Sequence, residues 1–578
     1  MTDPVPSVKH RSRGPRLFRG CALTALVGLS CLDTSINAPP PVATLTVVPA
    51  PIGIRVGQAV QFRAIAWDAR GGQLPLPGAV EWSSGDTSIV RVSANGVGVG
   101  ISLGTATISA DLKGVVARAA VGVSPRDKRP NVILIVTDDA RSDDIAYMPT
   151  VQRLLVSQGL TFSNFFVTTG TCCPSRSSIL RGQYAHNHGT LSNVPPAGSF
   201  LQFRALGNEH STVATWLQAA GYRTVLLGKY LNRYPGYPNP EPTYVPPGWT
   251  EWYAVFAPSE GDPAYYDYLM NENGHETTYG HGPQDYLTDV LTRRATRFVR
   301  QSQFLGNPFF MYIAPYAPHQ PSTPGPNHVA AFAGFVPPRS PAFNEADVSD
   351  KWLGVSRLPL LTDSAVAVLD SAQRLRLESL LSVDDMVRAL VDTLQATAAL
   401  DDTYIFLSSD NGLEVGEHRL WLTKETPYEE TIRLPLLVRG PGVAAGGVTA
   451  AMALNIDLAP TFAELASVPA PSFVDGRSLV PFLQGQNPPW RHAFAEEVWA
   501  ENSAITPRLV FQQIRTENYS YIEFYDGERE LYDLGVDPYE LQSIYKTAPA
   551  SLLTQLSGWL KALRGCVGPA CRTLDVAP

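Results

Sequence analysis

The sequence predicts an α/β chain. A doubly wound sheet forms its largest domain, a small all-β sandwich precedes this domain, and a small antiparallel sheet follows it. Short alternating apolar runs fill residues 43–124. Continuous β-branched runs separated by helical stretches fill residues 129–490, and alternating runs return in residues 491–578. A chain of 578 residues is long enough for two or three such domains.

Residues 1–31 have the pattern of an export signal. Five Lys and Arg residues among the first 19 precede a short apolar run, Cys21–Ser30, which is too short to span a bilayer. The sequence Leu29-Ser30-Cys31 loosely resembles a bacterial lipobox, in which Cys31 is lipidated and tethers the protein to a membrane. Plain secretion after cleavage near Ser30 is the alternative. Both hypotheses place the protein outside the cytoplasm of a bacterium, in the periplasm, on the cell surface or secreted.

Residues 32–42 form a proline-containing linker, which predicts a stiff tether. In residues 43–124, runs such as Ala43–Val48 and Gly104–Ala110 alternate with period two and are separated by turn residues, which predicts a small β-sandwich. The run Val80–Asp86 and the turns that follow it are similar to bacterial Ig-like group 2 domains. That resemblance implies a spacer or a surface-interaction module without catalytic residues.

Residues 129–490 alternate between buried strands and amphipathic helices. The run Pro130–Val136 is continuously apolar and β-branched, as is typical of a strand buried on both faces. Further strands are predicted at Thr224–Leu227, Phe309–Ile313, Tyr404–Leu407 and Leu436–Val438, and helices at Thr212–Ala220, Tyr286–Gln301 and Ser382–Thr397. This alternation favours a doubly wound sheet with helices on both faces.

Residues 491–578 predict a small antiparallel sheet followed by a helix. The strands are expected at Leu509–Arg515, Tyr519–Phe524 and Glu530–Leu534, and the helix at Pro549–Arg564. Near the end, Cys566 and Cys571 are spaced for a small disulfide-closed loop. Such a loop fits an oxidising compartment. Cys172 and Cys173 remain as an adjacent pair, which rarely bonds to itself.

The formal charge of -8 gives the chain no basic footprint for nucleic acid, so a nucleic-acid partner is not expected. Acidic and amide side chains instead follow two of the predicted strands. Asp138 and Asp139 end the first strand, and Asp410 and Asn411 end the strand at Tyr404. In open α/β sheets, sites gather at the carboxyl ends of strands. An all-oxygen set suits Ca²⁺, or Mg²⁺, better than zinc, and simple turn formation is the alternative interpretation.

Basic side chains stand at similar loop positions. Lys229 and His319 follow two other predicted strands, and Lys424 follows the Asp410-Asn411-Gly412 turn. One such residue alone is usually a solvated surface group. Their recurrence after strands that end near carboxylates predicts a site that binds an anion beside a metal ion.

The segment Thr171-Cys172-Cys173-Pro174-Ser175-Arg176 carries the most specific motif of the chain. The pattern Cys-x-Pro-Ser-Arg, followed by Ser177–Gly182, resembles the signature of the type I sulfatases. In that family the first cysteine is converted to formylglycine by a maturation enzyme, and the hydrate of this aldehyde is the nucleophile. A loop with two ordinary thiols is the alternative.

The resemblance extends over roughly residues 131–541 and implies an alkaline-phosphatase-like fold. It also implies a metal site and a reaction centre. Calcium binding is implied for Asp138, Asp139, Asp410 and Asn411, together with formylglycine at Cys172; catalytic roles are implied for Cys172, Arg176, Lys229, His319, Asp410 and Lys424. Ser175, Asn232 and His418 are weaker candidates for substrate contacts.

The substrate class follows from a narrower resemblance. The sequences Lys229-Tyr230-Leu231-Asn232 and Gln183–His188 are closest to N-acetylglucosamine-6-sulfatases, which implies a sulfated sugar or a related sulfate ester. Many arylsulfatases have a histidine at the position of Leu231, so the contact of that histidine is in doubt here. Aromatic residues are dense in Tyr234–Asp267, which predicts either a wall that stacks on sugars or simple loop packing.

Two other functions stay open from the sequence. A phosphoester or phosphonate hydrolase of the same superfamily would use a similar metal cluster. A non-catalytic surface protein would bind glycans through the Ig-like module and keep an inactive enzyme domain as a scaffold. The intact cysteine, carboxylate and basic sets favour an enzyme that hydrolyses a sulfate ester.

Overall fold

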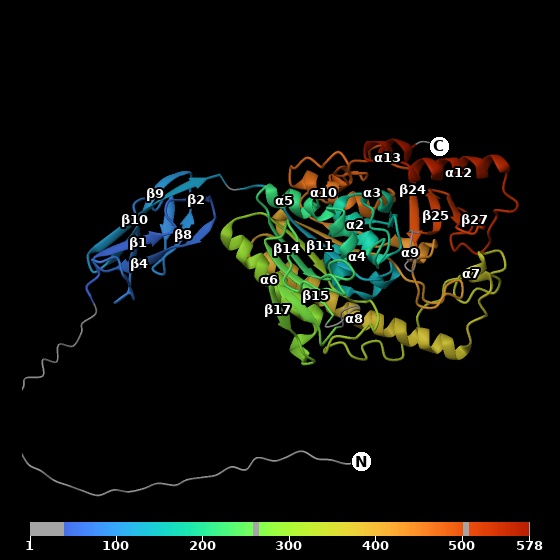
Figure 1. Ribbon diagram of the computed structural model, residues 1–578, viewed down its shortest axis with the longest axis horizontal. Coiled ribbons are helices and arrows are strands. Elements are labelled where there is room, and N and C mark those ends of the chain that lie inside the picture. The colour runs from blue at the N-terminus through green and yellow to red at the C-terminus, as the bar shows by residue number, and fades with distance from the viewer. Residues whose placement is uncertain (1–39, 126, 258–264, 501–507, 577–578) are drawn as a thin grey trace, which may run out of the picture.

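The computed structural model describes residues 40–125, 127–257, 265–500 and 508–576 (Figure 1). The export signal predicted for residues 1–31, which includes Cys31, lies outside the described residues. Residues 32–39 of the predicted linker lie outside them as well. Within the described ranges, no helix has both the length and the apolar character needed to cross a membrane.

The N-terminal unit contains only strands and packs around one apolar core, which confirms the predicted Ig-like sandwich (Figure 1). Its strands form three small sheets in the orders β1-β4-β5, β2-β10-β9-β6 and β3-β8-β7. The longest strand shows the expected alternation, because every second side chain of β10 from Ala117 to Val123 is buried. The strands are β1 (Thr44–Val48), β2 (Ile52–Arg55), β3 (Ala59–Gln61), β4 (Arg63–Trp67), β5 (Gln73–Leu74), β6 (Glu81–Ser84), β7 (Val90–Val92), β8 (Val97–Gly100), β9 (Gly104–Leu112) and β10 (Val115–Ser124).

A ten-stranded mixed sheet forms the centre of the large domain, in the order β17-β16-β15-β14-β18-β11-β19-β21-β12-β22. Five neighbouring strands at the centre of this order are parallel to one another: β15, β14, β18, β11 and β19. The strands next to them on either side, β16 and β21, are antiparallel. All seven residues of β11 are buried, as predicted for a strand covered on both faces. The bounds are β11 (Asn131–Thr137), β12 (Leu160–Phe162), β14 (Arg223–Gly228), β15 (Glu251–Phe256), β16 (Leu269–Glu272), β17 (His275–Thr278), β18 (Phe309–Ala314), β19 (Thr403–Ser409), β21 (Leu437–Arg439) and β22 (Gly447–Thr449).

Helices cover both faces of this sheet, which confirms the doubly wound prediction. The even-numbered side chains of β11 pack with α2 (Cys172–Arg181), α5 (Val213–Ala219) and α10 (Leu458–Leu465). Its odd-numbered side chains pack with α6 (Leu287–Leu305) and α8 (Asp363–Ala396) on the opposite face. Shorter elements connect these layers: α1 (Pro149–Val151), α3 (Ala185–His188), α4 (Ser199–Ala205), α7 (Leu353–Ser356), α9 (Glu429–Ile432), α11 (Val480–Leu483), β13 (Phe165–Phe166), β20 (Arg433–Leu434), β23 (Ala453–Leu454) and the single turns at Asp143–Tyr147, Gln152–Val156, Asn208–His210, Pro283–Asp285, Leu400–Asp402 and Asn455–Asp457.

Helix α8 begins much earlier than the predicted start at Ser382. Thr362 caps it, accepting a hydrogen bond from the backbone N–H of Ala365. The added N-terminal half buries Leu369, Leu377 and Leu380. Between them it also buries Gln373 and Arg376 against Asp144, and these polar residues interrupt the apolar pattern in the sequence.

The C-terminal part contains the predicted antiparallel sheet and helix, shown at the upper right of Figure 1. Its sheet has the order β24 (Ala493–Trp499), β25 (Leu509–Thr516), β26 (Tyr519–Phe524) and β27 (Arg529–Asp533), followed by α12 (Ala550–Arg564) and α13 (Pro569–Leu574). Strand β24 was not predicted, because two adjacent glutamates interrupt its apolar pattern. Cys566 and Cys571 form a disulfide. The Cys566 carbonyl accepts a hydrogen bond from Asn187, just after α2.

Candidate active site

Strand register brings two of the predicted carboxylates together. Strands β11 and β19 pair in parallel with Thr137 opposite Ser409, so the residues that follow them, Asp138 and Asp410, emerge side by side. The backbone N–H of Asp139 donates to Asp410 Oδ1 at 3.2 Å. The backbone N–H of Asn411 donates to the same oxygen at 2.9 Å. The predicted carboxylate set is therefore assembled by backbone pairing.

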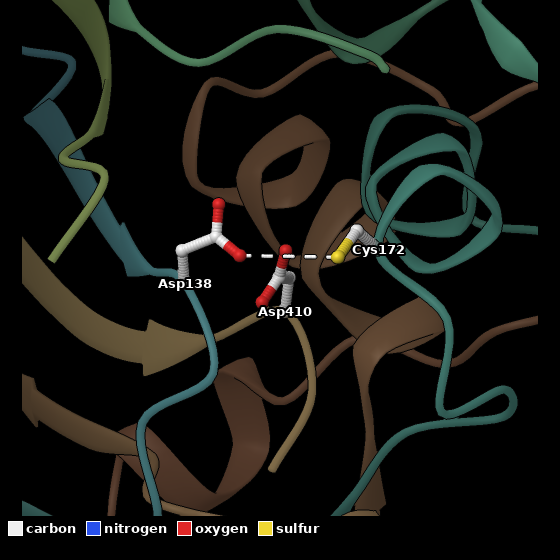
Figure 2. Close-up of side chains that lie close together, drawn as sticks. All are labelled: Asp138, Cys172 and Asp410. Atoms are coloured by element: carbon white, nitrogen blue, oxygen red, sulfur yellow. Dashed lines mark hydrogen bonds between the residues drawn. The ribbon is translucent and has the colours of Figure 1, made fainter. Parts of the chain in front are cut away.

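Helix α2 aims the cysteine motif at these carboxylates. Cys172 is its first residue, and Arg176 lies one turn later on the same face. The Cys172 Sγ lies 3.8 Å from Asp138 Oδ1, and Figure 2 shows Cys172, Asp138 and Asp410 pointing toward one another. Arg176 donates from Nε to Asp410 Oδ2 at 2.8 Å and from Nη2 to Asp138 Oδ2 at 3.3 Å. Cys172 and Arg176 are buried together with both carboxylates.

The three predicted basic residues reach the same point. Lys229 Nζ lies 2.5 Å from Asp138 Oδ2. Lys424 Nζ lies 2.6 Å from Asp139 Oδ1 and 2.8 Å from Cys172 Sγ. His319 Nε2 lies 3.7 Å from Asp139 Oδ2. We call the nine residues of this arrangement the central cluster: Asp138, Asp139, Cys172, Arg176, Lys229, His319, Asp410, Asn411 and Lys424.

Two glycines make this convergence sterically feasible. Gly228 has a φ of 101°, and a Cβ there would lie 2.1 Å from the carbonyl oxygen of Ala314. A side chain would therefore push Lys229 away from the strand edge. At Gly412 a Cβ would lie 2.0 Å from the carbonyl oxygen of Glu430. Both positions require the absence of a side chain.

The donor set of the central cluster fits a hard divalent cation. Donor atoms of Asp138, Cys172 and Asp410 lie within 4.8 Å of one another, as do those of Asp138, Asp139 and His319. Asn411 donates from Nδ2 to Asp139 Oδ1 at 2.6 Å, which leaves its Oδ1 free to act as a ligand. That oxygen is buried and has no hydrogen-bond partner among the described residues. A buried acceptor beside three carboxylates is where a cation would bind.

Positively charged neighbours favour the ionised form of Asp138 and of Asp139. Burial alone would raise the pKa of Asp138, but the nearby Lys229, His319 and Arg176 outweigh it and lower that pKa. The pKa of Asp139 is lowered in the same way, because Lys424 and other positive neighbours outweigh the effect of burial. Burial raises the pKa of the Cys172 thiol well above its usual value, although Lys229 and Lys424 oppose the effect. The unmodified thiol is thus a poor nucleophile despite its basic neighbours.

The three weaker candidates lie in different settings. Ser175 is fully buried, and its hydroxyl accepts a hydrogen bond from Asn455 at 3.1 Å, so it ties α2 to the chain rather than facing a ligand. His418 is also fully buried, and its Nδ1 lies 2.7 Å from Glu345 Oε2. Burial lowers the His418 pKa to about 3, with Lys351 adding to the effect. The buried side-chain oxygen of Asn232 has no hydrogen-bond partner among the described residues.

Most aromatic residues of the 234–267 region are buried, and Tyr234 and Trp252 show that they serve packing. Tyr234 donates to the carbonyl oxygen of Tyr244, and Trp252 donates to the Tyr234 hydroxyl. Trp252 and Tyr234 both belong to the apolar core beneath the sheet. The sugar-stacking alternative therefore does not apply to these side chains.

Glu414 holds the segment that carries Lys424, and the sequence did not predict this role. Its backbone N–H donates to Thr423 at 2.8 Å, and its Oε1 accepts from Thr426 at 2.8 Å. It thus holds the chain on both sides of Lys424. Glu414 is fully buried, and burial, followed by the charges of Glu430 and Glu417, raises its pKa well above the usual value. The carboxyl is therefore protonated, and Arg141 opposes this shift only partly.

The substitution Glu414→Gln is expected to reduce the loss of stability that occurs as the pH rises. The folded protein keeps a proton on Glu414 that the unfolded chain releases near its ordinary pKa of 4.5. The stability from this group is complete below that pH and is lost as the pH rises toward the folded-state pKa. Glutamine keeps an acceptor oxygen for Thr426 and does not ionise. Denaturant unfolding at a series of pH values from about 5 to 9 measures the effect.

The variant Glu414→Ala is the control, since it removes the acceptor that the hydroxyls of Thr426 and Thr431 share and leaves them only their bond to each other. It should lower the free energy of unfolding by about 1–3 kcal/mol at every pH. A pH dependence of Glu414→Gln that equals the wild-type dependence would contradict the protonated state.

Comparisons with known proteins agree with this geometry. The family model described as Sulfatase matches residues 130–468, and the one described as N-sulphoglucosamine sulphohydrolase, C-terminal, matches residues 416–565. The bacterial Ig-like domain (group 2) model matches residues 41–122. Human N-acetylglucosamine-6-sulfatase is 36% identical over 492 residues, which cover 79% of this chain and 88% of the human protein.

Two solved structures are similar in fold. A protein solved in complex with its substrate D-glucosamine-2-N,6-O-disulfate has a TM-score of 0.63 and 25% identity, covering 78% of this chain and 99% of that one. The phosphonate monoester hydrolase of Silicibacter pomeroyi has a TM-score of 0.57 and 22% identity, covering 75% of this chain and 94% of that one. The second likeness concerns the fold alone.

Proposed function

Since the chain belongs to the sulfatase family and is a sulfate ester hydrolase, we propose that it removes the 6-O-sulfate of a sulfated glucosamine unit and that formylglycine at position 172 is its nucleophile. The observation that carries this proposal is the position of Cys172. Its Sγ stands at the start of α2, 2.8 Å from Lys424 Nζ and 3.8 Å from Asp138 Oδ1. The sugar follows from the relatives named N-acetylglucosamine-6-sulfatase and from the substrate of the structural neighbour.

Asp138, Asp139, Asp410 and Asn411 would hold a calcium ion, or magnesium, together with residue 172. The unpartnered Asn411 Oδ1 supports this assignment. When bound, the ion supplies positive charge to the sulfuryl oxygens and favours ionisation of a hydroxyl beside it.

The residues of the chain supply the remaining steps. Water adds to the aldehyde of residue 172 and gives it two hydroxyls. One hydroxyl gives its proton to Asp410 and attacks sulfur, while Lys229 and Lys424 stabilise the charge on the sulfuryl oxygens. The bond between sulfur and the sugar oxygen breaks, and His319 or Lys424 protonates that oxygen. The second hydroxyl then gives its proton back to the group that protonated the sugar oxygen, the bond from carbon to the sulfate oxygen breaks, and the aldehyde returns. Arg176 orients the hydrate through its pairing with Asp138 and Asp410.

The other parts of the chain fit a protein that works outside the cytoplasm. The export pattern in residues 1–31 and the Cys566–Cys571 disulfide support this location, with lipid at Cys31 or secretion as the two routes. The division into residues 43–124 as a spacer, 129–490 as the catalytic domain and 491–578 as its C-terminal subdomain follows the sequence pattern. A formylglycine-generating enzyme is the partner that the proposal requires.

The test combines peptide mass spectrometry with sulfate release. Protein from its native host should contain formylglycine at residue 172 in the peptide that spans Thr171 to Arg176. It should release sulfate from N-acetylglucosamine 6-sulfate faster than phosphate from the matched 6-phosphate. Chelation of divalent ions should abolish the activity, and calcium should restore it. An unmodified thiol at residue 172, or a faster phosphate release, would contradict the proposal and favour a phosphoester hydrolase.

A further inference from the structure

We infer that Trp421 is the aromatic platform on which the sugar ring of the substrate stacks, beside the reaction centre. This inference rests on the proposed function, because it identifies the site for the sugar part of the sulfate ester. It starts from one side chain that the fold does not use.

Trp421 stands apart from the other nine tryptophans of the chain, all of which lie in described ranges. It is 44% exposed, whereas each of the others is buried or half-buried. Among the described residues it also has neither a hydrogen bond from its indole nitrogen nor a contact with another ring. Each other tryptophan has at least one of these, as Trp352 does with Asp526 and Phe524. Tryptophan is enriched at binding surfaces, because its large ring can stack on a partner while its N–H stays available for a hydrogen bond.

The loop that carries Trp421 is held firmly just before it. Arg419 donates three hydrogen bonds to backbone carbonyls of a neighbouring segment: to Glu345 at 2.8 Å, to Leu358 at 2.7 Å and to Ala346 at 2.8 Å. The backbone N–H of His418 donates to the Ala342 carbonyl at 2.8 Å. A guanidinium bonded through all three of its nitrogens to backbone acceptors fixes the chain locally.

The loop is held after Trp421 as well. Thr423 pairs with Glu414 in an isolated antiparallel bridge. Between and beside these anchors, Leu422 has a φ of 39° and Glu425 a φ of 67°, in the left-handed region that side chains rarely adopt. Such conformations persist where the surroundings impose them, and they gather at ligand sites. Trp421 is thus presented on a rigid loop, which limits the entropy cost of stacking.

The position along the chain places the ring close to the chemistry. Trp421 precedes Lys424 by three residues, and three residues span at most about 11 Å. Lys424 Nζ is 2.8 Å from Cys172 Sγ. The Cα atoms of Trp421 and Lys424 therefore lie within about 11 Å of each other, near enough for the indole to stack on the sugar that carries the sulfate. Tyr234 and Trp252 are not alternatives, because both are buried in the core.

The test uses the full chain with formylglycine verified, and the variants Trp421→Ala and Trp421→Phe. The substrates are N-acetylglucosamine 6-sulfate and a disaccharide that contains it, and inorganic sulfate serves as a product inhibitor that occupies only the reaction centre. Trp421→Ala should raise KM for both sugars on the order of tenfold, the scale of one aromatic stacking contact. Its kcat and its inhibition constant for sulfate should remain unchanged. Trp421→Phe should restore most of the KM.

Tyr525→Ala is the matched control, since Tyr525 is 50% exposed at the turn after β26 and carries no part of the central cluster. The Tyr525→Ala protein should have the KM, the kcat and the sulfate inhibition constant of the wild type. An unchanged KM in Trp421→Ala overturns the inference. A sulfate inhibition constant that weakens together with KM also overturns it, because the substitution would then act by displacing Lys424. If the wild-type enzyme releases sulfate from neither sugar, the proposed substrate class is wrong, which is a separate result.

Discussion

The Cys172→Ala protein is expected to release sulfate at least about a thousandfold more slowly than the wild type. A loss of this size is typical when an enzyme loses its activated nucleophile. Alanine cannot be converted to an aldehyde, so no hydroxyl remains at the start of α2 to attack sulfur. The substitution removes one sulfur atom from a buried position and leaves every charged residue of the central cluster in place. Initial rates of sulfate release from N-acetylglucosamine 6-sulfate measure the effect.

Cys173→Ala is the control, because Cys173 is adjacent, also buried, and part of the apolar core instead of the central cluster. It should keep kcat within about threefold and lose stability instead, on the scale of a small cavity of about 1 kcal/mol. If Cys173→Ala were the inactive variant and Cys172→Ala the active one, the assignment of the nucleophile would be reversed.

Arg176→Ala is expected to lower the free energy of unfolding by about 3–5 kcal/mol in metal-free buffer, besides abolishing activity. Arg176 pairs with Asp138 and Asp410, and all three side chains are fully buried. Removing the guanidinium leaves two adjacent carboxylates without their shared partner. Calcium should therefore raise the unfolding midpoint of Arg176→Ala by more than it raises that of the wild type. Denaturant unfolding with a chelator and with calcium gives both quantities.

Arg491→Ala provides the comparison. Arg491 is equally buried and pairs with Asp457 and Asp575, outside the central cluster. It should lose stability to a similar extent, while calcium should stabilise it no more than it stabilises the wild type. An Arg176→Ala protein as stable as the wild type would show that the two carboxylates are compensated by other groups, with Lys229 as the nearest candidate.

The sequence predicted those features that have a local pattern. Strand β11 was recognisable from its continuous apolar run, and the residues at its end and at the end of β19 were recognisable because parallel neighbours share an edge. Cys172 and Arg176 were found through a motif whose spacing equals one helical turn.

Features that depend on contacts between distant segments were missed. Glu414 supports Lys424 through Thr423 and Thr426, and nothing in the local sequence distinguishes it from a surface glutamate. The first half of α8 was missed because Gln373 and Arg376, which are buried against Asp144, interrupt its apolar pattern. The aromatic residues around Trp252 could be assigned to packing only once their neighbours were known.

The contact between α3 and the disulfide loop has a consequence for the order of events during synthesis. His186 and Asn187, just after the cysteine motif, both contact the carbonyl oxygen of Cys566, and Asn187 also donates to Asp475 at 2.8 Å. These partners are synthesised long after Cys172, so α3, which packs against α2, lacks these contacts until then. Cys172 is 1% exposed once that packing is complete. The late arrival of the C-terminal segment thus leaves a period in which these contacts are missing, and we expect the proposed oxidation of Cys172 to take place in that period.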